Sequence, residues 1–406
     1  MTPVPIPIEA SDAILGASPR RVLEPATLDE AAQAMRALAA EKLAVAFVGG
    51  GTDLELGAAP RRLDAVLRTR RLARVREHAP ADQIVAVEGG MTIAALQRTL
   101  APHRQRLALD PPEPERATVG GVVAANAFGP RRTRFGSVRD LVIGVTLVRA
   151  DGVVAHGGGK VVKNVAGFDL PRLLCGSLGT LGLVAEVVFR LHPLPEASAT
   201  AAFDGLSGID VQDTLPALRE LGVEPTALAA LPDGVHFRLA IRFEGFAPGV
   251  KDQVDRVLGR AGGGARLEGV EEAALWSRHD ALRAAGAVRV KATFAPAALV
   301  GALDALSPLR AALGGEGPIL HPALGIALLA GDAGDAAAVA AGVEHARLRL
   351  RKLGNGSVVI VAAPPAVRAL VDPWGPAPAG FEVMRRLKHE LDPEARLAPG
   401  RFVGGI

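Results

Sequence analysis

Glycine is concentrated in three short clusters in the first half of this chain, and this pattern limits what that half can form. The densest stretch, residues 157–182, holds seven glycines in 26 residues. An ordinary helix or strand would not use so many, because glycine loses more backbone entropy on folding than any other residue. Two further clusters, residues 49–51 and 120–121, lie upstream. Glycine lets backbone approach a flat or anionic ligand closely, so the three clusters indicate one large cofactor held at three places.

The composition indicates a globular enzyme of two domains. A length of 406 residues exceeds the size at which a single core stops growing, about 250–300 residues. Hydrophobic residues make up 49% of the chain, and the net charge of +3 comes from scattered basic residues, which disfavours nucleic-acid binding. The single cysteine, Cys175, excludes internal disulfides and a self-contained iron–sulfur site. We interpret Cys175, which stands among apolar neighbours, as a buried residue rather than a nucleophile.

The sequence shows no sign of a targeting or membrane segment. Residues 1–7 have neither a basic segment nor an apolar run. No window approaches the ~18 uninterrupted apolar residues of a membrane span. We therefore expect a cytoplasmic protein without a transmembrane segment, any membrane association being made through partners. Residues 1–15 are expected to be flexible, and the arginine run from Arg68 to Arg76 is interpreted as a solvated face because it alternates with apolar residues.

Helices and strands alternate in the first 100 residues, which is typical of an α/β subdomain. Thr27 and Glu30 form a capping box that begins a helix ending near residue 40. An apolar strand over residues 43–48 then leads to the first glycine cluster. From residue 141 onward the pattern favours strands, with an Asp-Gly turn at residues 151–152. The further elements expected in this half are strands at 65–67, 84–87, 141–148, 153–155 and 184–191 and a helix at 92–100.

A domain boundary is expected after residue 195, because Pro193 and Pro195 interrupt both helix and strand. Beyond it, strand-like and helix-like segments predict an antiparallel sheet backed by helices. The expected strands are 236–242 and 288–293, and the expected helices are 249–260, 271–285, 296–313, 335–348 and 381–391.

The loop that follows the first buried strand has the composition of an anion site. Successive amide N–H groups of Gly49, Gly50 and Gly51 can converge on one point and hold a pyrophosphate without lysine, while Thr52 adds a hydroxyl donor. The alternative is a flexible connection between a strand and a loop. No Gly-Lys-Ser/Thr follows, so this is not a Walker loop. The dinucleotide fingerprint is also absent, because residues 176–182 are spaced Gly-x-x-Gly-x-x-Gly.

The order of these motifs, ending in Pro399-Gly400-Arg401, resembles the FAD domain of the PCMH-type flavoproteins, the vanillyl-alcohol-oxidase family. The similarity runs from about residue 22 to 194 and resumes at 371–375 and 384–402. Within the family the chain is similar to the smaller flavin subunits of glycolate oxidase complexes. The resemblance implies an α+β fold class: a PCMH-type two-subdomain FAD-binding fold with an α+β cap of antiparallel sheet plus helices. It implies an FAD-binding domain in residues 16–195, a cap in 196–375 and a C-terminal segment, 376–406, that returns to the FAD domain.

The resemblance also implies the cofactor and its contacts. Thr52 stands where relatives with covalent flavin carry histidine, which implies noncovalent FAD. The backbone of Gly120 and Gly121 would lie against the flavin, and Asn126 would donate to a flavin carbonyl; a small-residue contact between helices is the alternative for the glycines. The residues implied to contact FAD are Gly49, Gly50, Gly51, Thr52, Asp53, Pro111, Thr118, Gly120, Gly121, Asn126, Gly129, Gly136, Gly179, Gly182, Val184 and Arg401.

Two residues in the densest glycine stretch are candidates for a catalytic role. Lys163 and Asn164 match the family segment that runs beside the flavin, where a lysine would stabilise negative charge on the reduced cofactor. The alternative for Lys163 is a surface lysine after a strand.

No metal site is expected. The nine histidines are widely spread, with at least 24 residues from one to the next, and no local metal motif exists, although distant histidines can converge. Related D-lactate dehydrogenases and larger flavin subunits carry a histidine-bearing acidic segment near their substrate metal. Its nearest counterpart here, Gly331-Asp332-Ala333, lacks the histidine.

Three functions remain open at this point. The first is an FAD-dependent oxidoreductase subunit of a glycolate (2-hydroxy acid) oxidase complex, with the flavin as hydride acceptor. Its implied partners are a larger homologous flavin subunit and an iron–sulfur subunit. The second is a non-catalytic flavin-binding or scaffold subunit that relays electrons or stabilises a partner. A nicotinamide dehydrogenase is disfavoured, because the dinucleotide fingerprint is absent.

Overall fold

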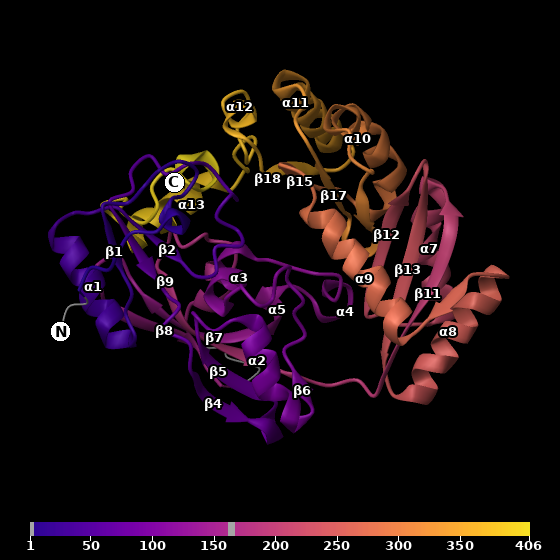
Figure 1. The fold of residues 1–406 in the computed structure, drawn as a ribbon, viewed down its shortest axis with the longest axis horizontal. Coiled ribbons are helices and arrows are strands. Elements are labelled where there is room, and N and C mark those ends of the chain that lie inside the picture. Colours follow the sequence, from indigo (N-terminus) through magenta and orange to yellow (C-terminus); the bar gives the residue numbers. More distant parts are fainter. Residues whose placement is uncertain (1–3, 161–166) are drawn as a thin grey trace. The chain divides into compact units, whose positions relative to one another are not determined.

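The chain folds into two compact units. The computed structural model describes residues 4–160 and 167–406. Unit 1 comprises Met1–Gly129, Phe135–Leu194 and Pro376–Ile406, and unit 2 comprises Pro130–Arg134 and Pro195–Gly375 (Figure 1). The chain passes from unit 1 to unit 2 between residues 194 and 195 and returns between residues 375 and 376; the boundaries expected from the sequence follow residues 195 and 375. The short segment Pro130–Arg134, which belongs to unit 2, has no counterpart in the sequence-based division.

Unit 1 begins with a small parallel sheet in the order β1-β3-β2. Thr27 accepts a hydrogen bond from the amide of Glu30, as the capping box predicts, and so begins the helix that packs on this sheet. Met35 and Leu38 of that helix are fully buried with Leu67 of β3. The elements are β1 (Arg21–Leu23), α1 (Leu28–Ala40), β2 (Val45–Val48) and β3 (Ala65–Arg68).

A second, antiparallel sheet in the order β4-β5-β9-β7-β8 completes the strand framework of unit 1. Its core combines Phe189 of β9 with buried side chains of α2, α3 and α5. The elements are β4 (Val75–Ala79), β5 (Ile84–Glu88), α2 (Ile93–Leu100), α3 (Val119–Ala125), α5 (Val138–Leu141), β7 (Val142–Val148), β8 (Val154–Gly158), α6 (Leu170–Leu174) and β9 (Leu183–Arg190). Strands β6 (Gln105–Arg106) and β10 (His192–Pro193) pair in a separate two-stranded sheet, and the short helix α4 (Arg132–Phe135) begins in the segment assigned to unit 2.

The N-terminal residues pack on the small sheet, which differs from the expected flexible segment. Ile14 is 1% exposed, and Asp12, at the end of the short 3-10 helix Ala10–Asp12, is fully buried. Arg68 of β3 donates to both carboxylate oxygens of Asp12, at 2.8 and 2.6 Å, and to Glu9 at 2.9 Å. Arg68 is 4% exposed, so the interpretation of the whole arginine run as a solvated face is wrong for this residue. Its partner lies 56 residues away in the sequence, beyond the reach of a local pattern.

Unit 2 is built on an eight-stranded antiparallel sheet in the order β14-β11-β13-β12-β16-β17-β15-β18. Side chains alternate between the two faces, because successive residues of a strand point to opposite sides. In β12, Leu228 and Ala230 belong to one core cluster, and Ala229 and Leu231 to another. The strands are β11 (Ala197–Leu206), β12 (Ala227–Asp233), β13 (His236–Gly245), β14 (Ala265–Leu267), β15 (Val288–Thr293), β16 (Ile319–His321), β17 (Ile326–Gly331) and β18 (Ser357–Ala362).

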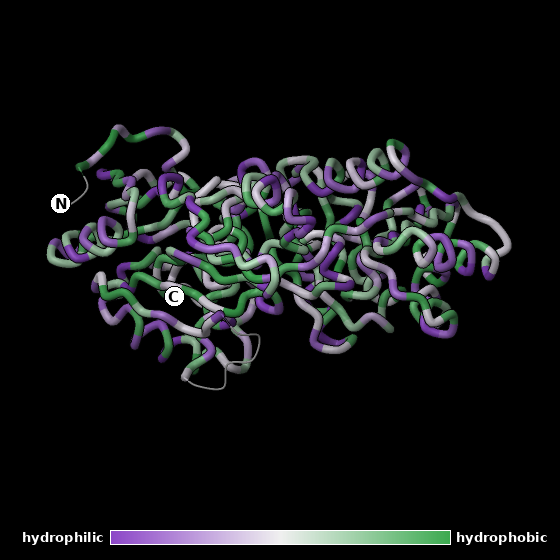
Figure 2. The backbone as a smooth tube through the Cα atoms, turned by 90° about the horizontal axis from the view of Figure 1, so that it is seen from below, coloured by the Kyte–Doolittle hydropathy of each residue, from purple (hydrophilic) through white to green (hydrophobic). Residues whose placement is uncertain are grey.

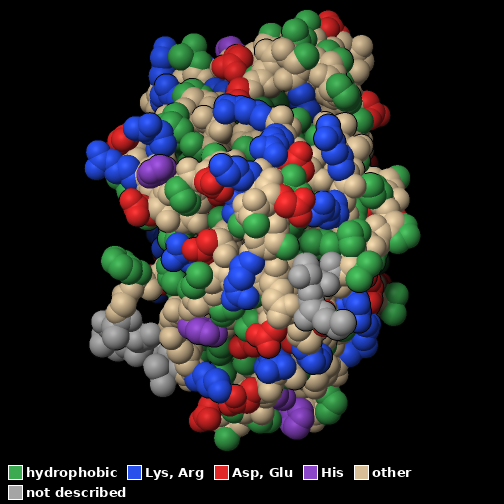
Figure 3. Space-filling model, turned by 90° about the vertical axis from the view of Figure 1, so that its left-hand side faces the viewer, with side chains coloured by type: hydrophobic (Ala, Val, Ile, Leu, Met, Phe, Trp, Pro, Cys, Tyr) green, Lys and Arg blue, Asp and Glu red, His purple; other side chains and the backbone are tan. Residues whose placement is uncertain are grey.

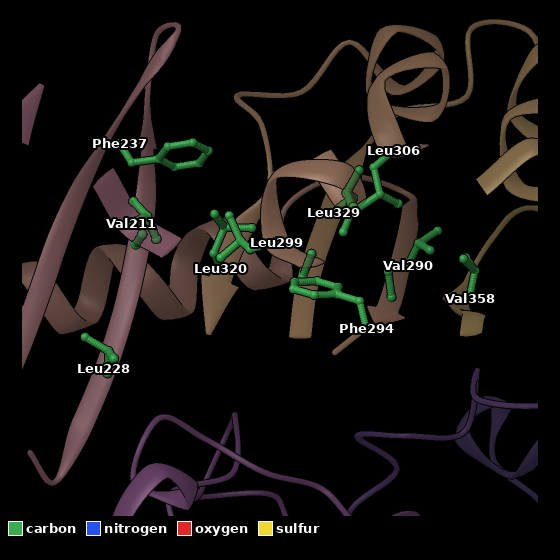
Figure 4. Close-up of a cluster of buried hydrophobic side chains, with 14 of the residues drawn as sticks. Val211, Leu228, Phe237, Val290, Phe294, Leu299, Leu306, Leu320, Leu329 and Val358 are labelled. Carbon is green, nitrogen blue, oxygen red and sulfur yellow. The ribbon is translucent and has the colours of Figure 1, made fainter. Parts of the chain in front are cut away.

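Helices cover the two faces of this sheet unequally. Five helices share the larger core cluster, part of which Figure 4 shows, with Val211, Phe237 and Leu299 among the labelled side chains. A single helix, α9, packs Leu275 and Trp276 against the smaller cluster. The helices are α7 (Gly208–Leu221), α8 (Ala247–Ala261), α9 (Gly269–Ala284), α10 (Leu299–Leu313), α11 (Ala336–Lys352) and α12 (Pro365–Arg368). The sheet backed by helices confirms the predicted α+β fold class.

One apolar segment, Pro296–Leu313, is long enough to cross a membrane by length and composition, with a mean hydropathy of 1.2. It consists of a short 3-10 turn and α10, whose buried residues include Leu299, Leu306 and Leu309. These side chains belong to the larger core of unit 2, which accounts for the apolar composition. Along the described chain, apolar and polar residues are interleaved on the helices (Figure 2).

The C-terminal segment returns to unit 1. Helix α13 (Phe381–Leu391) is followed by residues that run beside β2. The amide of Val45 donates to the carbonyl of Arg396 at 2.7 Å, and the amide of Ala398 donates to the carbonyl of Val45 at 2.8 Å. The chain therefore leaves unit 1 to form unit 2 and then adds to the edge of the first sheet of unit 1.

Candidate functional site

A cleft in unit 1 collects the glycine clusters that lie far apart in the sequence. It encloses about 780 Å³, including its open mouth, within the range of about 300–1,000 Å³ typical of ligand sites. Most of the residues implied to contact FAD line it: Gly49, Gly50, Gly51, Thr52, Asp53, Thr118, Gly120, Gly121, Gly179, Gly182, Val184 and Arg401.

The first glycine loop is shaped by contact with the segment before α3. A Cβ atom on Gly50 would lie 1.7 Å from the carbonyl oxygen of Arg116, and one on Gly49 would lie 2.1 Å from Oγ1 of Thr118. Gly51 has a φ of +77°, which side chains disfavour. Because positions 49 and 50 carry no side chains, the backbone of the first glycine cluster can touch the segment that leads into the second cluster. Together they form one wall of the cleft.

The second cluster stands in the first turn of α3. Thr118 caps this helix by accepting from the amide of Gly121 at 3.4 Å. A Cβ atom on Gly120 would lie 3.0 Å from the carbonyl oxygen of Gly89, so this glycine packs against backbone. One on Gly121 would meet only Oγ1 of Thr118, at 3.1 Å. Gly121 thus leaves space in the cleft, while Gly120 serves the close packing of the helix.

The third contribution is the loop of residues 176–182. Its backbone is held by α3: the amide of Gly176 donates to the carbonyl of Val123 at 2.9 Å, and that of Leu178 to Ala124 at 2.8 Å. Leu178 and Gly179 have φ values of +51° and +72°. A Cβ atom on Gly179 would lie 3.0 Å from the ring of Phe47. Left-handed backbone and close contact both explain why glycine recurs here.

The cleft offers backbone and apolar surface with little charge. Asp53 and Arg401 are the charged residues among those of the described chain that line it. Arg401 donates to the carbonyls of Leu54 and Leu56, at 3.1 and 2.7 Å, and thereby fixes the loop after the first glycine cluster. A net-neutral wall of amides, hydroxyls and apolar groups fits a ligand that is partly aromatic and partly anionic, as FAD is.

Four of the implied FAD contacts lie outside this lining, namely Pro111, Asn126, Gly129 and Gly136. Gly129 instead packs on Asp110, whose carbonyl oxygen would lie 1.9 Å from an added Cβ. Asn126 ends α3 with a φ of +51°, and among the described residues its buried Oδ1 has no hydrogen-bond partner. Lys163 and Asn164 lie outside the described residues.

Several lining residues were missed by sequence reasoning. Phe47 could have been found, because it is an apolar residue of the strand that leads to the first glycine cluster; it packs partly against the core under α1 and also lines the cleft. Ile14 had no signal, since its segment was expected to be flexible. The missed residues are Ile14, Ala46, Phe47, Leu54, Thr69, Ala124, Ala125, Leu178, Leu183 and Ala398.

The titratable groups outside the cleft form no metal centre. His279 and His321 in unit 2 converge, with 3.3 Å between their Nε2 atoms, but no group of three or more His, Cys, Asp or Glu side chains suited to a metal occurs in the part of the chain that the structure describes. Burial raises the pKa of the Cys175 thiol to about 12, so the thiolate that a nucleophile requires is disfavoured. Basic and acidic side chains are interspersed on the face of the described residues shown in Figure 3.

Comparison with known proteins agrees with the geometry of the cleft. Residues 19–158 match the family of the FAD binding domain. The chain is 31% identical over 219 residues to glycolate oxidase subunit GlcD of Bacillus subtilis, covering 52% of this chain and 47% of that protein. It is 35% identical over 175 residues to glycolate oxidase subunit GlcE of Escherichia coli, covering 42% and 48%. It is 36% identical over 174 residues to D-lactate dehydrogenase of Archaeoglobus fulgidus, covering 42% and 38%. The matches thus span about half or less of these relatives.

Solved structures share the whole architecture. A structure of alkyldihydroxyacetonephosphate synthase matches with a TM-score of 0.71 at 18% identity, covering 96% of this chain and 78% of that one. A second structure of the synthase matches with a TM-score of 0.67 at the same identity, covering 94% and 77%. At this identity the likeness shows the fold alone. The family match and the cleft lined by three glycine clusters lead to one conclusion: the chain contains a PCMH-type FAD-binding domain.

Proposed function

We propose that this chain is an FAD-dependent oxidoreductase subunit acting on a small 2-hydroxy acid, with glycolate as the first candidate. The carrying observation is the cleft of unit 1, whose walls come from the three glycine clusters of the FAD-binding domain. The substrate class is supported by the names of its relatives, glycolate oxidase subunits and a D-lactate dehydrogenase.

Each part of the cleft has a role in this proposal. Amide N–H groups of residues 49–51 hold the diphosphate, and Phe47 and Leu178 give apolar contact to the ring systems. When bound, FAD supplies the hydride-accepting chemistry, while the protein supplies orientation and charge. Lys163 is proposed to stabilise negative charge that develops on the cofactor, and Asn164 to help orient it. Thr52 at the linkage position supports noncovalent binding.

The experiment is a visible spectrum of the purified chain followed by anaerobic addition of glycolate. We expect a yellow protein that releases FAD into the supernatant on acid precipitation and loses its flavin absorbance with glycolate. D-lactate and D-2-hydroxyglutarate serve as alternative substrates in parallel samples. Flavin that stays in the acid pellet would contradict noncovalent binding, and a protein that cannot be reconstituted with FAD would contradict the whole proposal.

A non-catalytic flavin-binding or scaffold subunit is the second candidate. It is favoured by the missing histidine-bearing segment and by the absence, among the described residues, of a group of three metal-ligating side chains. In that case the chain binds FAD, yet none of the three acids bleaches it. Reduction by a partner subunit, but not by the acids, would then identify an electron relay.

We also propose that the chain works in a complex with a larger homologous flavin subunit and an iron–sulfur subunit. One cysteine cannot hold a cluster, so electrons need an external acceptor. Co-expression with both subunits, affinity capture and size-exclusion chromatography test this. Elution of the chain alone, together with full-rate glycolate oxidation by that fraction, would replace the complex by a self-sufficient oxidase.

A further inference from the structure

Helix α13 buries a lysine in place of an apolar side chain. Lys388 is the buried residue of this helix, while Val383 and Leu387 on the same helix are 61% and 36% exposed. A buried ammonium group is costly unless each of its three N–H donors finds an acceptor. Phe381, Met384 and Leu391 are partly buried at helical spacing from Lys388, so the most buried position of this otherwise apolar face holds a charged group. The ammonium group at this position must therefore be compensated by its own hydrogen bonds.

The three donors of Lys388 join the C-terminal segment to a distant loop of unit 1. Nζ donates to Oδ2 of Asp392 at 2.7 Å, to the carbonyl of Leu397 at 2.9 Å and to the carbonyl of Thr180 at 2.8 Å. Asp392 and Leu397 belong to the C-terminal segment, whereas Thr180 lies 208 residues away in the loop of residues 176–182. Burial lowers the pKa of Lys388, and the Asp392 carboxylate opposes that shift.

Both pieces of chain that Lys388 joins belong to the cofactor cleft. On one side of Thr180 stand Leu178 and Gly179, and on the other Gly182, all of which line the cleft. Next to Leu397 stands Ala398, which also lines it. The Thr180 hydroxyl and amide both bond to the carbonyl of Ser177, at 2.7 and 3.0 Å, so the loop is a tight turn whose outer carbonyl faces Lys388. A change in the position of Nζ is therefore transmitted to the wall of the cleft.

We propose that Lys388 is a positioning residue for FAD: its ammonium group fixes the loop of residues 176–182 in the shape that accepts the cofactor, and thereby couples helix α13 to cofactor occupancy. Lys388 does not line the cleft, so it acts through Thr180 and Leu397. Coupling between two sites is reciprocal. FAD must therefore stabilise α13 to the same extent that Lys388 stabilises bound FAD. The inference rests on the assignment of the cleft to FAD.

The first test uses the unaltered full chain. Hydrogen exchange is measured by mass spectrometry with and without saturating FAD. We expect FAD to slow exchange in the loop of residues 176–182 and also in residues 388–398, although α13 does not line the cleft. Protection confined to the cleft loops overturns the proposal. Failure of FAD to bind at all is a different result, because it contradicts the cofactor assignment rather than the role of Lys388.

The second test compares Lys388→Met with Arg386→Met, a change at an exposed residue of the same helix. FAD affinity is measured by quenching of flavin fluorescence, below the unfolding temperature of both apoproteins. We expect Lys388→Met to bind FAD at least about tenfold more weakly, the usual worth of a lost charged hydrogen bond, and to alter the visible circular dichroism of bound flavin. Arg386→Met should match the parent.

A purely structural lysine would give another pattern. It would lower the unfolding midpoint of apoprotein and leave the FAD affinity and the dichroism of the folded fraction at parent values, which overturns the proposal. Where Lys388→Met does not yield folded protein, Lys388→Gln, which keeps two N–H donors on a shorter side chain, is measured by the same criteria. The exchange experiment decides independently of both variants.

Discussion

Unit 1 packs backbone against backbone around its cleft, whereas unit 2 packs side chains between a sheet and its helices. In unit 1, Cβ atoms on Gly50 and Gly90 would each lie 1.7 Å from a backbone carbonyl oxygen of another segment. In unit 2, Phe243 and Leu299 are fully buried within the larger core cluster. Unit 1 is thus destabilised most by side-chain atoms added at its glycines, whereas unit 2 is destabilised most by atoms removed from its buried side chains. A cofactor that is bound through backbone requires the first kind of packing.

The two units also differ in what their buried ion pairs hold. In unit 1, Arg68 is the partner of fully buried Asp12. Burial opposes ionisation of Asp12, but hydrogen bonds from Arg68 and from the amide of Glu9, together with the guanidinium charge, lower its pKa overall. In unit 2, Glu272 accepts from Arg242 and also from the hydroxyls of Ser198 and Thr200. Loss of the arginine therefore leaves Glu272 with two hydroxyl donors, whereas Asp12 keeps only the amide of Glu9 among the hydrogen bonds described for it.

The largest expected effect follows from this difference. Arg68→Met should lower the free energy of unfolding by about 3–5 kcal/mol, because it leaves a buried carboxylate without its cation. Arg242→Met should cost clearly less. Urea unfolding of each variant at pH 7 measures both. In the parent, the contribution of Asp12 is present above its unfolded pKa of about 3.9 and is lost as the pH falls through its lower folded value. Equal losses in the two variants would remove the distinction between the pairs.

The next effect concerns one added methyl group. Gly50→Ala should destabilise unit 1 by about 3 kcal/mol or more, at the upper end of overpacking costs, since the obstacle is a backbone carbonyl. Gly121→Ala is the matched control, because its Cβ would meet only a threonine hydroxyl. Circular dichroism during thermal unfolding of the apoproteins compares them. If Gly50→Ala were as stable as the parent, the backbone of the first glycine loop would be able to move away from the carbonyl of Arg116, which contradicts tight packing.

A bulkier side chain at Gly121 distinguishes an effect on FAD binding from an effect on the stability of the fold. Gly121→Val should weaken FAD binding about tenfold or more while changing apoprotein stability by less than about 1 kcal/mol, because the added groups enter ligand space. Fluorescence titration with FAD gives the affinity, and urea unfolding gives the stability. Unchanged affinity would mean that FAD does not approach this turn of α3.

A smaller, pH-dependent effect is expected in unit 2. Burial, the charge of His279 and that of Arg283 hold the pKa of His321 well below its usual range. The unfolded chain therefore binds a proton that the folded chain does not, and stability falls as the pH drops below about 6.5. The unfolding midpoint in urea between pH 7.5 and 5, followed by fluorescence of Trp276 and Trp374, should decline more steeply for the parent than for His321→Gln. His345→Gln, at an exposed position, should retain the parental slope.

The last prediction concerns the reactivity of Cys175 rather than the stability of either unit. With a pKa near 12, the Cys175 thiol is ionised in about one molecule in ten thousand at pH 8. Alkylation of the native protein should therefore be at least about a hundredfold slower than in urea. Rapid native labelling at pH 8 would contradict the buried thiol and reopen a reactive role.

Much of the framework followed from local sequence. The N-cap predicted at Thr27 begins α1, although the Glu30 side chain accepts from the amide of Ala26 rather than from that of Thr27, and the expected boundaries of α13 and β15 coincide with the observed ones. The sequence also predicted that the glycine clusters lie together around one ligand, because so many glycines are unusual in a helix or strand. The family resemblance and the FAD cofactor are confirmed by the match over residues 19–158.

What local sequence did not predict depends on partners far along the chain. Arg68 looks like any surface arginine until Asp12, 56 residues away, is placed beside it. The convergence of His279 and His321 follows from the position of β16 in the sheet. Strand β12 escaped prediction because both of its faces are buried, so its alanines and leucines show no alternation.

The path of the chain through the two units has a consequence for biosynthesis. Residues 376–406 complete unit 1 only after all of unit 2 has been made. On a ribosome, unit 2 can collapse as soon as it emerges, whereas the edge of the small sheet at Val45 stays unpaired until residues 396–398 arrive. Ala398 and Arg401 line the cleft, so the cleft is complete only after these residues have been made. Nascent chains that stall before α13 expose an open strand edge of the kind that chaperones and aggregates recognise.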